Sequence, residues 1–289
     1  MPEQLTIPWG NRTLGLEFEF TRSVSQEVLA GAVRYALPDI SPDLIGIRDW
    51  EHNNDNREWL VKRDGSCGWE VITPRLDGTQ QSLDDACAVL EACRKVGAQV
   101  SPRCGVHIHL GTQEISESRV GRIVAHWVRF EGMIFWSLPR KRRANQFCMS
   151  ISRSGDFRPG RTYNSGDLIQ ACGSDRYRAL NIRPWQEGHN RIEYRPIEAT
   201  LDPTTVWNWA AFLMYFTERA CHRDIPQDLR WLSLEESMQW LDWEDRSKLH
   251  PDLAQVRDWW LRRIIRYSSI RQKNHQCRQK AKEYLQNEC

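Results

Sequence analysis

Several short stretches of the chain alternate apolar and polar residues, which is the period of a half-buried β-strand. The alternation is clearest where Leu14, Leu16 and Phe18 are interleaved with Glu17 and other non-apolar residues. Two further stretches flank an Asp-Gly pair, a strong turn signal that predicts a hairpin. We predict strands over residues 13–21, 58–62, 68–73, 105–111, 178–183 and 191–197.

Helical periodicity fills the segments between these strands. The first predicted helix begins at Ser25, a favourable N-cap, and stops before Pro38. We predict helices over residues 25–37, 82–96, 116–138 and 204–222, and a helical pattern from residue 233 to the end.

The order of these elements predicts an α+β fold with a largely antiparallel sheet and helices on one face. Parallel βαβ units fit poorly, because two neighbouring strands have a hairpin pattern and the glycine-rich phosphate loops of doubly wound folds are absent from the sequence. We divide the chain into a mixed core over residues 1–222 and a helical, basic C-terminal extension over residues 223–289.

The non-apolar positions of four strands carry acidic and imidazole side chains. Successive side chains of a strand point to opposite faces of the sheet. If the apolar faces pack on helices, the other faces gather these groups on one surface of one sheet. The groups are Glu17, Glu19, Glu70, His107, His109 and Glu193.

Four carboxylates on one surface repel one another and require raised pKa values or bound cations. Oxygen-rich sites with one or two imidazoles suit Mg²⁺ or Mn²⁺ better than zinc. Two such ions on a polyphosphate would neutralise the charge that develops in phosphoryl transfer. Arg195, two residues from Glu193, would point into the same site and hold phosphate. The alternative is that each polar face is a solvated outer face of its strand.

Composition excludes few partners. The 40 Lys and Arg residues nearly balance the 38 Asp and Glu residues, so neither nucleic acid nor a membrane is favoured as the main partner. No apolar run approaches the ~20 residues of a membrane span, and the first ten residues do not resemble a secretory signal. The 9 scattered cysteines are typical of reduced thiols in a cytoplasmic protein. A zinc cluster of Cys104, His107 and His109 is an alternative.

A series of short motifs, taken in order, resembles the amidoligase family. These are carboxylate–amine ligases similar to glutamine synthetase and glutamate–cysteine ligase. The likeness extends from about residue 14 to residue 209. The motifs are GLEFEF at 15–20, DGS at 64–66, GWE at 68–70, CGVHIH at 104–109, RRAN at 142–145, FC at 147–148, YRALN at 177–181 and RIEYR at 191–195.

The resemblance implies an enzyme in which ATP phosphorylates a carboxylate and an amine displaces the phosphate, forming an amide and releasing ADP and phosphate. It also implies a curved sheet like that of the glutamine synthetase catalytic domain, with the ions and the nucleotide on its concave face. Both substrates, the carboxylate and the amine, could be small molecules or peptides. The general base for the amine is not identifiable from these motifs.

The resemblance also implies roles for individual residues. Glu17 would join His107 and Glu193 on one Mg²⁺ or Mn²⁺ ion, while Glu19 and Glu70 would hold the other. The family pattern usually has three carboxylates for that second ion, which leaves Asp64 or water to complete it. The remaining roles are nucleotide binding by His109, Arg142 and Arg143, phosphoryl binding by Arg195, and orientation of the carboxyl substrate by Asn181.

Two basic stretches leave other functions open. Residues 139–161 hold 7 Lys and Arg against 1 Asp, and residues 257–289 hold 9 against 3 acidic residues. The first stretch is predicted to be a loop, either solvated or closing over an anionic ligand. The second is predicted to be a packed helix with a basic outer face, or a surface for an acidic protein or nucleic acid partner.

Two rival classes remain. One is a nucleic-acid- or protein-binding scaffold with a degenerate ligase core. The other is a cupin-like metal enzyme, which His107-x-His109 followed by Glu114 and Gly121 partly matches. A cupin is nearly all strand, whereas the residues after Ile115 have a helical pattern. Binding of ATP and Mg²⁺ distinguishes the ligase from both rivals.

Overall fold

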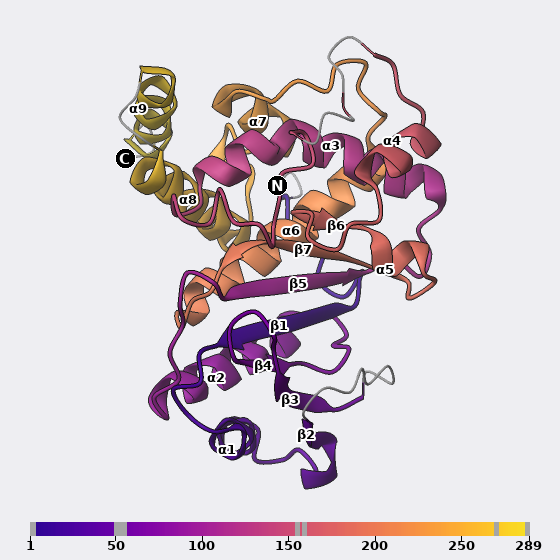
Figure 1. Ribbon diagram of the computed structural model, residues 1–289. Coiled ribbons are helices and arrows are strands. Elements are labelled where there is room, and N and C mark those ends of the chain that lie inside the picture. Colours follow the sequence, from indigo (N-terminus) through magenta and orange to yellow (C-terminus); the bar gives the residue numbers. More distant parts are fainter. Residues whose placement is uncertain (1–3, 49–56, 154–156, 158–160, 269–271, 287–289) are drawn as a thin grey trace. The chain divides into compact units, whose positions relative to one another are not determined.

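The computed structural model describes residues 4–48, 57–153, 157, 161–268 and 272–286 (Figure 1). Arg158, Arg271 and Cys289, which belong to the basic stretches and the cysteine set, lie outside the described residues.

Seven strands form one sheet in the order β2-β3-β4-β1-β5-β7-β6. They are β1 (Leu14–Phe20), β2 (Ile45–Arg48), β3 (Trp59–Arg63), β4 (Trp69–Ile72), β5 (Gly105–Gly111), β6 (Leu180–Asn181) and β7 (Arg191–Glu198).

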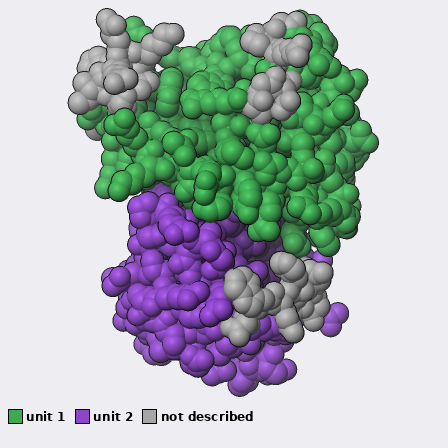
Figure 2. Space-filling view, viewed as in Figure 1, with its two compact units in different colours: residues 1–8, 112–192, 211–289 green, residues 9–111, 193–210 purple. Residues whose placement is uncertain are grey.

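The chain forms two compact units whose segments interleave along the sequence (Figure 2). Unit 1 comprises residues 1–8, 112–192 and 211–289, and unit 2 comprises residues 9–111 and 193–210. The predicted division at residue 222 follows neither boundary and stays a prediction. Unit 2 contains β1 to β5 and most of β7, the strands on which the acidic and imidazole residues were predicted.

In unit 2 the predicted alternation along β1 is confirmed. Leu14, Leu16, Phe18 and Phe20 are each at most 1% exposed. The helices of this unit are α1 (Gln26–Ala36) and α2 (Gln80–Lys95). They contact each other, and α1 also contacts β2 and β3. Both begin at hydroxyl caps: the Ser25 side chain accepts from the Val28 amide at 3.4 Å, and Thr79 accepts from Ser82 at 3.3 Å.

Most of the described strand pairings are antiparallel, as predicted. β1 pairs antiparallel with β4 and with β5, and β3 pairs antiparallel with β4. The exception is the parallel pair of β2 with β3. β2 was not predicted, because its four residues, which follow a 3-10 turn over Pro42–Leu44, are too few to show a period. The fold is therefore a mixed α and β architecture around one seven-stranded sheet.

The turn between β3 and β4 depends on an aspartate and a glycine. Asp64 Oδ1 accepts hydrogen bonds from the amides of Ser66 at 2.7 Å and Cys67 at 2.8 Å. Gly68 has a φ of +151°, and a Cβ atom there would lie 2.8 Å from the carbonyl oxygen of Phe20. A larger residue would therefore displace β4 from β1, so this position needs glycine.

Unit 1 is built mainly from helices around an aromatic core. Its helices are α3 (Glu117–Trp136), α4 (Ser165–Cys172), α5 (Arg183–Gln186), α7 (Leu234–Leu241), α8 (Pro251–Tyr267), α9 (Gln272–Gln286) and the later part of α6 (Pro203–His222). Neighbouring rings in the core have centroids 4.7 to 6.1 Å apart. These rings are Trp127, Phe130, Phe212, Phe216, Trp240, Trp243 and Trp260. Four of the 14 tryptophans of the chain are therefore buried in this core.

The structure corrects one predicted strand and one predicted helical segment, and it adds a helix that was not predicted. The strand predicted over residues 178–183 covers only Leu180–Asn181, because Asn181 Oδ1 accepts from the Arg183 amide at 3.0 Å and α5 begins at Arg183, with Pro184 in its first turn. The helical pattern after residue 233 is interrupted between α7 and α8, since Asp242 takes a left-handed conformation. The unpredicted α4 begins with a capping box of Asn164 and Asp167.

The basic face predicted after residue 257 is also partly wrong. Arg257 is fully buried and donates from Nε to the Trp243 carbonyl at 2.7 Å. Arg263 is also buried and donates to the Ser137 carbonyl at 3.0 Å. Charged heads that satisfy buried carbonyls serve packing rather than an outer surface. Within the described residues, no helix is both long and apolar enough to span a membrane.

Candidate metal centre

The strand register of unit 2 aligns the acidic and imidazole side chains. Glu17 on β1 is directly opposite His107 on β5, and Gly15 is opposite His109. On the other edge of β1, Glu19 is directly opposite Glu70 on β4. Because alternate side chains of a strand share a face, this register places the polar side chains of three neighbouring strands in adjacent rows.

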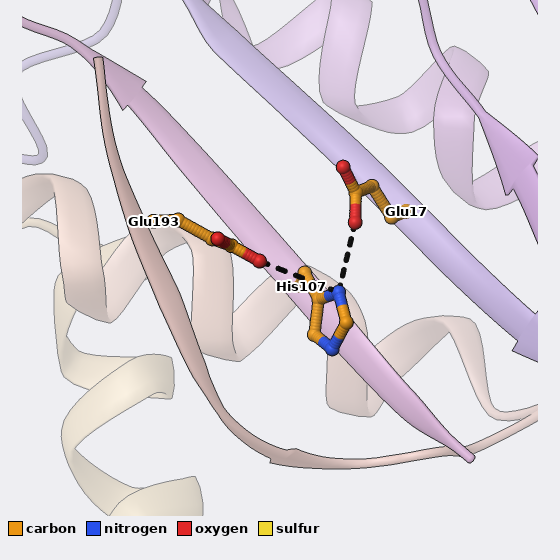
Figure 3. Close-up of side chains that lie close together, drawn as sticks. All are labelled: Glu17, His107 and Glu193. Atoms are coloured by element: carbon orange, nitrogen blue, oxygen red, sulfur yellow. Dashed lines mark hydrogen bonds and ion pairs between the residues drawn. The ribbon is translucent and has the colours of Figure 1, made fainter. Parts of the chain in front are cut away.

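The first cluster consists of Glu17, His107 and Glu193 (Figure 3). One candidate ligand atom from each residue lies within 4.8 Å of the others. His107 Nδ1 is 2.8 Å from Glu17 Oε2 and 3.5 Å from Glu193 Oε1. The other oxygen of Glu17 is 2.9 Å from His109 Nε2. Two carboxylates and an imidazole at this spacing suit one divalent cation.

The second cluster consists of Glu19, Glu70 and His107, all of them buried. His107 Nε2 is 3.4 Å from Glu19 Oε1, so His107 contacts the carboxylates of the two clusters through different ring nitrogens. The other oxygen of Glu19 accepts from the Gly105 amide at 2.5 Å. Lys62 on β3 forms an ion pair with Glu70 at 3.2 Å.

The carboxyl groups of the first cluster favour the ionised form. Burial raises the pKa of Glu17, but the charges and hydrogen bonds of His109 and His107 outweigh burial and hold this pKa well below its usual range. Burial also raises the pKa of Glu193, and the charges of Arg195, His109 and His107 turn the net shift downward. Both carboxylates are therefore compensated by positive neighbours within unit 2.

Glu70 in the second cluster behaves in the opposite way. Burial and the negative charge of Glu17 raise its pKa well above the usual range. Glu19 adds to this rise, and the charge of Lys62 only partly opposes it. Without a further cation, the protonated form of Glu70 is therefore favoured.

Arg195 and His109 border the first cluster. Arg195 is buried and pairs with Glu193. Burial lowers the pKa of Arg195, but Glu193 and Glu17 reverse the shift and raise it. His109 lies one alternation along β5 from His107, and its Nδ1 atom has no hydrogen-bond partner among the described residues. Both side chains can donate to an anion beside the cluster.

Neither Asp64 nor Cys104 joins a cation cluster found in the described part of the chain. Asp64 is engaged in the β3–β4 turn. Cys104 Sγ is 3.3 Å from Ser101 Oγ, and a hydrogen bond from Cys67, opposed by burial, lowers the Cys104 pKa to about 6. The alternative zinc cluster of Cys104, His107 and His109 is therefore not formed. The eight cysteines within the described residues are free thiols.

Three predicted site residues belong to unit 1. Arg143 donates from Nε to the Leu138 carbonyl at 2.9 Å and from Nη2 to the Trp136 carbonyl at 3.1 Å, bonds that satisfy the end of α3. Arg142 and Asn181 are buried. Their roles in nucleotide binding and in substrate orientation stay predictions.

The sequence analysis missed Lys62. Its position is directly opposite Glu70 across the β3–β4 pair. Counting outward from the predicted Asp64-Gly65 turn pairs Lys62 with Cys67 instead. The observed connection runs from Asp64 to Gly68, so that Arg63 is opposite Trp69 and Lys62 is opposite Glu70.

Comparison with known proteins identifies the class. The family model described as "Putative amidoligase enzyme" matches residues 10–217, well over half of the chain. The chain therefore belongs to the amidoligase family and, with it, to the carboxylate–amine ligases in general. A search of the curated proteins finds no match.

Two solved structures show a distant likeness. A bifunctional glutathione synthetase from Pasteurella multocida is 10% identical with a TM-score of 0.41, covering 96% of this chain and 52% of that protein. A glutamine synthase homologue is 14% identical with a TM-score of 0.38, covering 94% of this chain and 70% of its own. The chain thus spans about half the length of the bifunctional synthetase. At these TM-scores neither likeness defines the fold.

Proposed function

We propose that this chain is an ATP-dependent carboxylate–amine ligase that forms an amide through an acyl phosphate and releases ADP and phosphate. The observation that carries the proposal is the pair of cation-ligand clusters that share His107 on adjacent strands of an amidoligase. A carboxylate is a poor electrophile, and phosphorylation supplies the leaving group that an amine can displace. The carboxylate and the amine are small molecules or peptides.

The residues fit divalent cations with a preference for oxygen and imidazole ligands. Glu17, His107 and Glu193 would hold one Mg²⁺ or Mn²⁺ ion, and Glu19 with Glu70 would hold the other. The raised pKa of Glu70 supports the second ion, because burial and the negative charge of Glu17 disfavour the ionised carboxylate and Lys62 only partly offsets them. Bound Mg²⁺ would neutralise charge on the transferred phosphoryl group.

The remaining roles belong to side chains that donate to anions. Arg195 would bind the transferred phosphoryl group, and its buried guanidinium beside Glu193 is already held in place for that contact. His109 would contact the nucleotide phosphates. It would use either its free Nδ1 atom or its Nε2 atom, which would then leave Glu17 for a phosphate oxygen. Arg142 and Arg143 would help to bind the nucleotide, and Asn181 would orient the carboxyl substrate.

The proposal also includes the shape of the site and a partner. We place the clusters on the concave face of a curved sheet of the glutamine synthetase type, with helices on the opposite face. For the C-terminal helices we propose an acidic partner. The exposed Arg262 and Arg266 of α8 are available to it, whereas the buried Arg257 is not. The cytoplasmic location remains a prediction.

The proposal is tested by measuring ADP release with Mg²⁺ across a panel of carboxylates and amines, followed by mass spectrometry of the products. We expect ADP release that requires one carboxylate and one amine, and a product whose mass equals both substrates less one water. A chain that binds neither ATP nor Mg²⁺ would contradict the ligase and favour the scaffold. A chain with redox or isomerase activity that ignores ATP would favour the cupin-like enzyme.

A further inference from the structure

Lys62 lies in the row of charged side chains that crosses the sheet at the second cluster. The register places Lys62 opposite Glu70, and Glu70 opposite Glu19, so the three residues follow one another across β3, β4 and β1. Lys62 Nζ is 3.2 Å from Glu70 Oε2, with side chains 20% and 7% exposed. The ammonium group therefore contacts a carboxylate that the proposed function assigns to a cation.

The row contains one positive and two negative side chains. Like charges directly opposite each other on a sheet are destabilising, so Glu19 and Glu70 need a compensating cation. Lys62 supplies one such charge and a divalent ion would supply two. An ion in this cluster and Lys62 Nζ would both lie at the Glu70 carboxylate, where the two positive charges repel each other. Lys62 and the ion therefore compete for the same carboxylate.

A polyphosphate removes this conflict. Lysine carries a compact point charge on a flexible stem and is a common phosphate ligand. A triphosphate beside the second cluster offers anionic oxygens both to the ion and to the ammonium group that the ion displaces. In the first cluster the groups that contact Glu17 and Glu193 are the imidazoles and Arg195, whose guanidinium carries several N–H donors and can serve a phosphate while it stays beside Glu193.

We propose that Lys62 is the internal counter-cation of the second cluster, and that it leaves Glu70 for the phosphates of a nucleoside triphosphate when the second divalent ion binds. This inference rests on the proposed function and deepens it. It makes cation binding ordered: the first cluster binds its ion without nucleotide, and the second cluster binds its ion together with the triphosphate.

The test measures how many Mn²⁺ ions the full chain binds and how tightly. Electron paramagnetic resonance detects the free Mn²⁺, with and without a non-hydrolysable ATP analogue. The wild-type chain should bind one Mn²⁺ tightly alone and a second only with the analogue. In Lys62→Met, the second Mn²⁺ should bind in the absence of nucleotide roughly tenfold more tightly than it does to the wild type. The analogue should bind roughly tenfold more weakly. Changes of this size are normal for the coupling between two ligands.

Two control variants separate charge from general disturbance. Lys62→Arg keeps the positive charge and should preserve the order in which the two ions bind. This variant can be measured even if Lys62→Met folds poorly. Lys95→Met, at an exposed position of α2, should behave as wild type. The inference is overturned if Lys62→Met binds Mn²⁺ and the analogue like the wild type, or if the second ion binds more weakly.

The outcomes also separate this inference from the proposed function. A wild-type chain that binds no Mn²⁺ under any condition contradicts both. Two ions with the analogue, together with an unchanged Lys62→Met, contradict only the role of Lys62. Ordered binding without any amide product contradicts the ligase reaction and leaves the counter-cation in place.

Discussion

The two cation clusters share His107 and the same kinds of ligand, yet the pKa shifts of Glu17 and Glu193 in the first are opposite to that of Glu70 in the second. Glu17 and Glu193 have lowered pKa values because imidazoles and Arg195 surround them. Glu70 has a raised pKa because it is buried and faces other carboxylates, with Lys62 as a partial counter-charge. The comparison teaches that the burial of each carboxylate and the neighbours that the strand register gives it together set its charge state.

This difference assigns different tasks to the two clusters. The first holds its carboxylates ionised before any ion arrives, so it is preorganised to bind a cation. The second must exchange a proton or an ammonium group for its ion. Both clusters are largely buried, and burial strengthens each of these electrostatic effects.

The largest effect should come from breaking the first cluster. Glu17→Gln removes a carboxylate charge that contacts both His107 and His109. We expect ADP release to fall by more than about 100-fold, since even residues that only orient metal ligands contribute about 10- to 100-fold. The fold should persist, because Glu17 and Gln have nearly the same size. Steady-state ADP release and far-ultraviolet circular dichroism measure the two outcomes.

Glu91→Gln is the matched control for this substitution. Glu91 pairs on the outer surface of α2 with the exposed Arg94, and such pairs contribute little. It should keep wild-type turnover. Near-normal turnover in Glu17→Gln would show that the first cluster is not part of the reaction.

The next largest effect is a pair of opposite pH dependences in the metal-free protein. The raised pKa of Glu70 means that its favourable contribution to stability is present at low pH and is lost as the pH rises through its folded-state value. Glu70→Gln should therefore become more stable than wild type as the pH rises. The gain should be several degrees in melting temperature, since one pKa unit corresponds to about 1.4 kcal/mol.

Glu193→Gln should show the reverse dependence. The lowered pKa of Glu193 means that its contribution is present above the unfolded-state value and is lost as the pH falls through the folded-state value. The variant should be less stable than wild type near neutral pH and should approach it in acid. Thermal unfolding in a chelator between about pH 4 and about pH 8 checks both variants. Parallel curves for the two variants would refute the contrast between the clusters.

The smallest effect should come from the turn that supports the second cluster alone. Asp64→Ala removes the acceptor of two amide hydrogen bonds and should cost about 1 to 3 kcal/mol of unfolding free energy. Binding of the first Mn²⁺ should be unchanged, because β1 and β5 do not depend on this turn. Denaturant unfolding and Mn²⁺ titration measure the two effects. Loss of the second Mn²⁺ with unchanged stability would instead place Asp64 among the ligands of that ion.

The sequence predicted the strands of the site well because their two faces differ so strongly. In β1 the buried Leu16 and Phe18 alternate with Glu17, and this alternation alone predicts a polar face. It predicted the short and irregular elements poorly. β2 has four residues and β6 has two, which is too short for any period to emerge from the pattern.

Arginine roles were the other weak point of the sequence analysis. A basic run such as residues 139–161 is equally compatible with a solvated loop and an anion-binding loop. The structure shows that Arg143 donates to carbonyls five and seven residues earlier, at the end of α3, and that Arg257 donates to the Trp243 carbonyl 14 residues earlier. These contacts depend on how the chain turns between the paired residues and leave no mark on the local pattern.

The sequence by itself determined which side chains share a face, because the period of a strand is a local property of the backbone. It thereby predicted that Glu17, His107 and Glu193 would point to one surface. Only the tertiary structure decided which of them are neighbours, since the pairing of β1 with β4 and β5 depends on packing between distant segments. That pairing divides the acidic surface into two clusters that share His107, and it places the Lys62 ammonium group against Glu70.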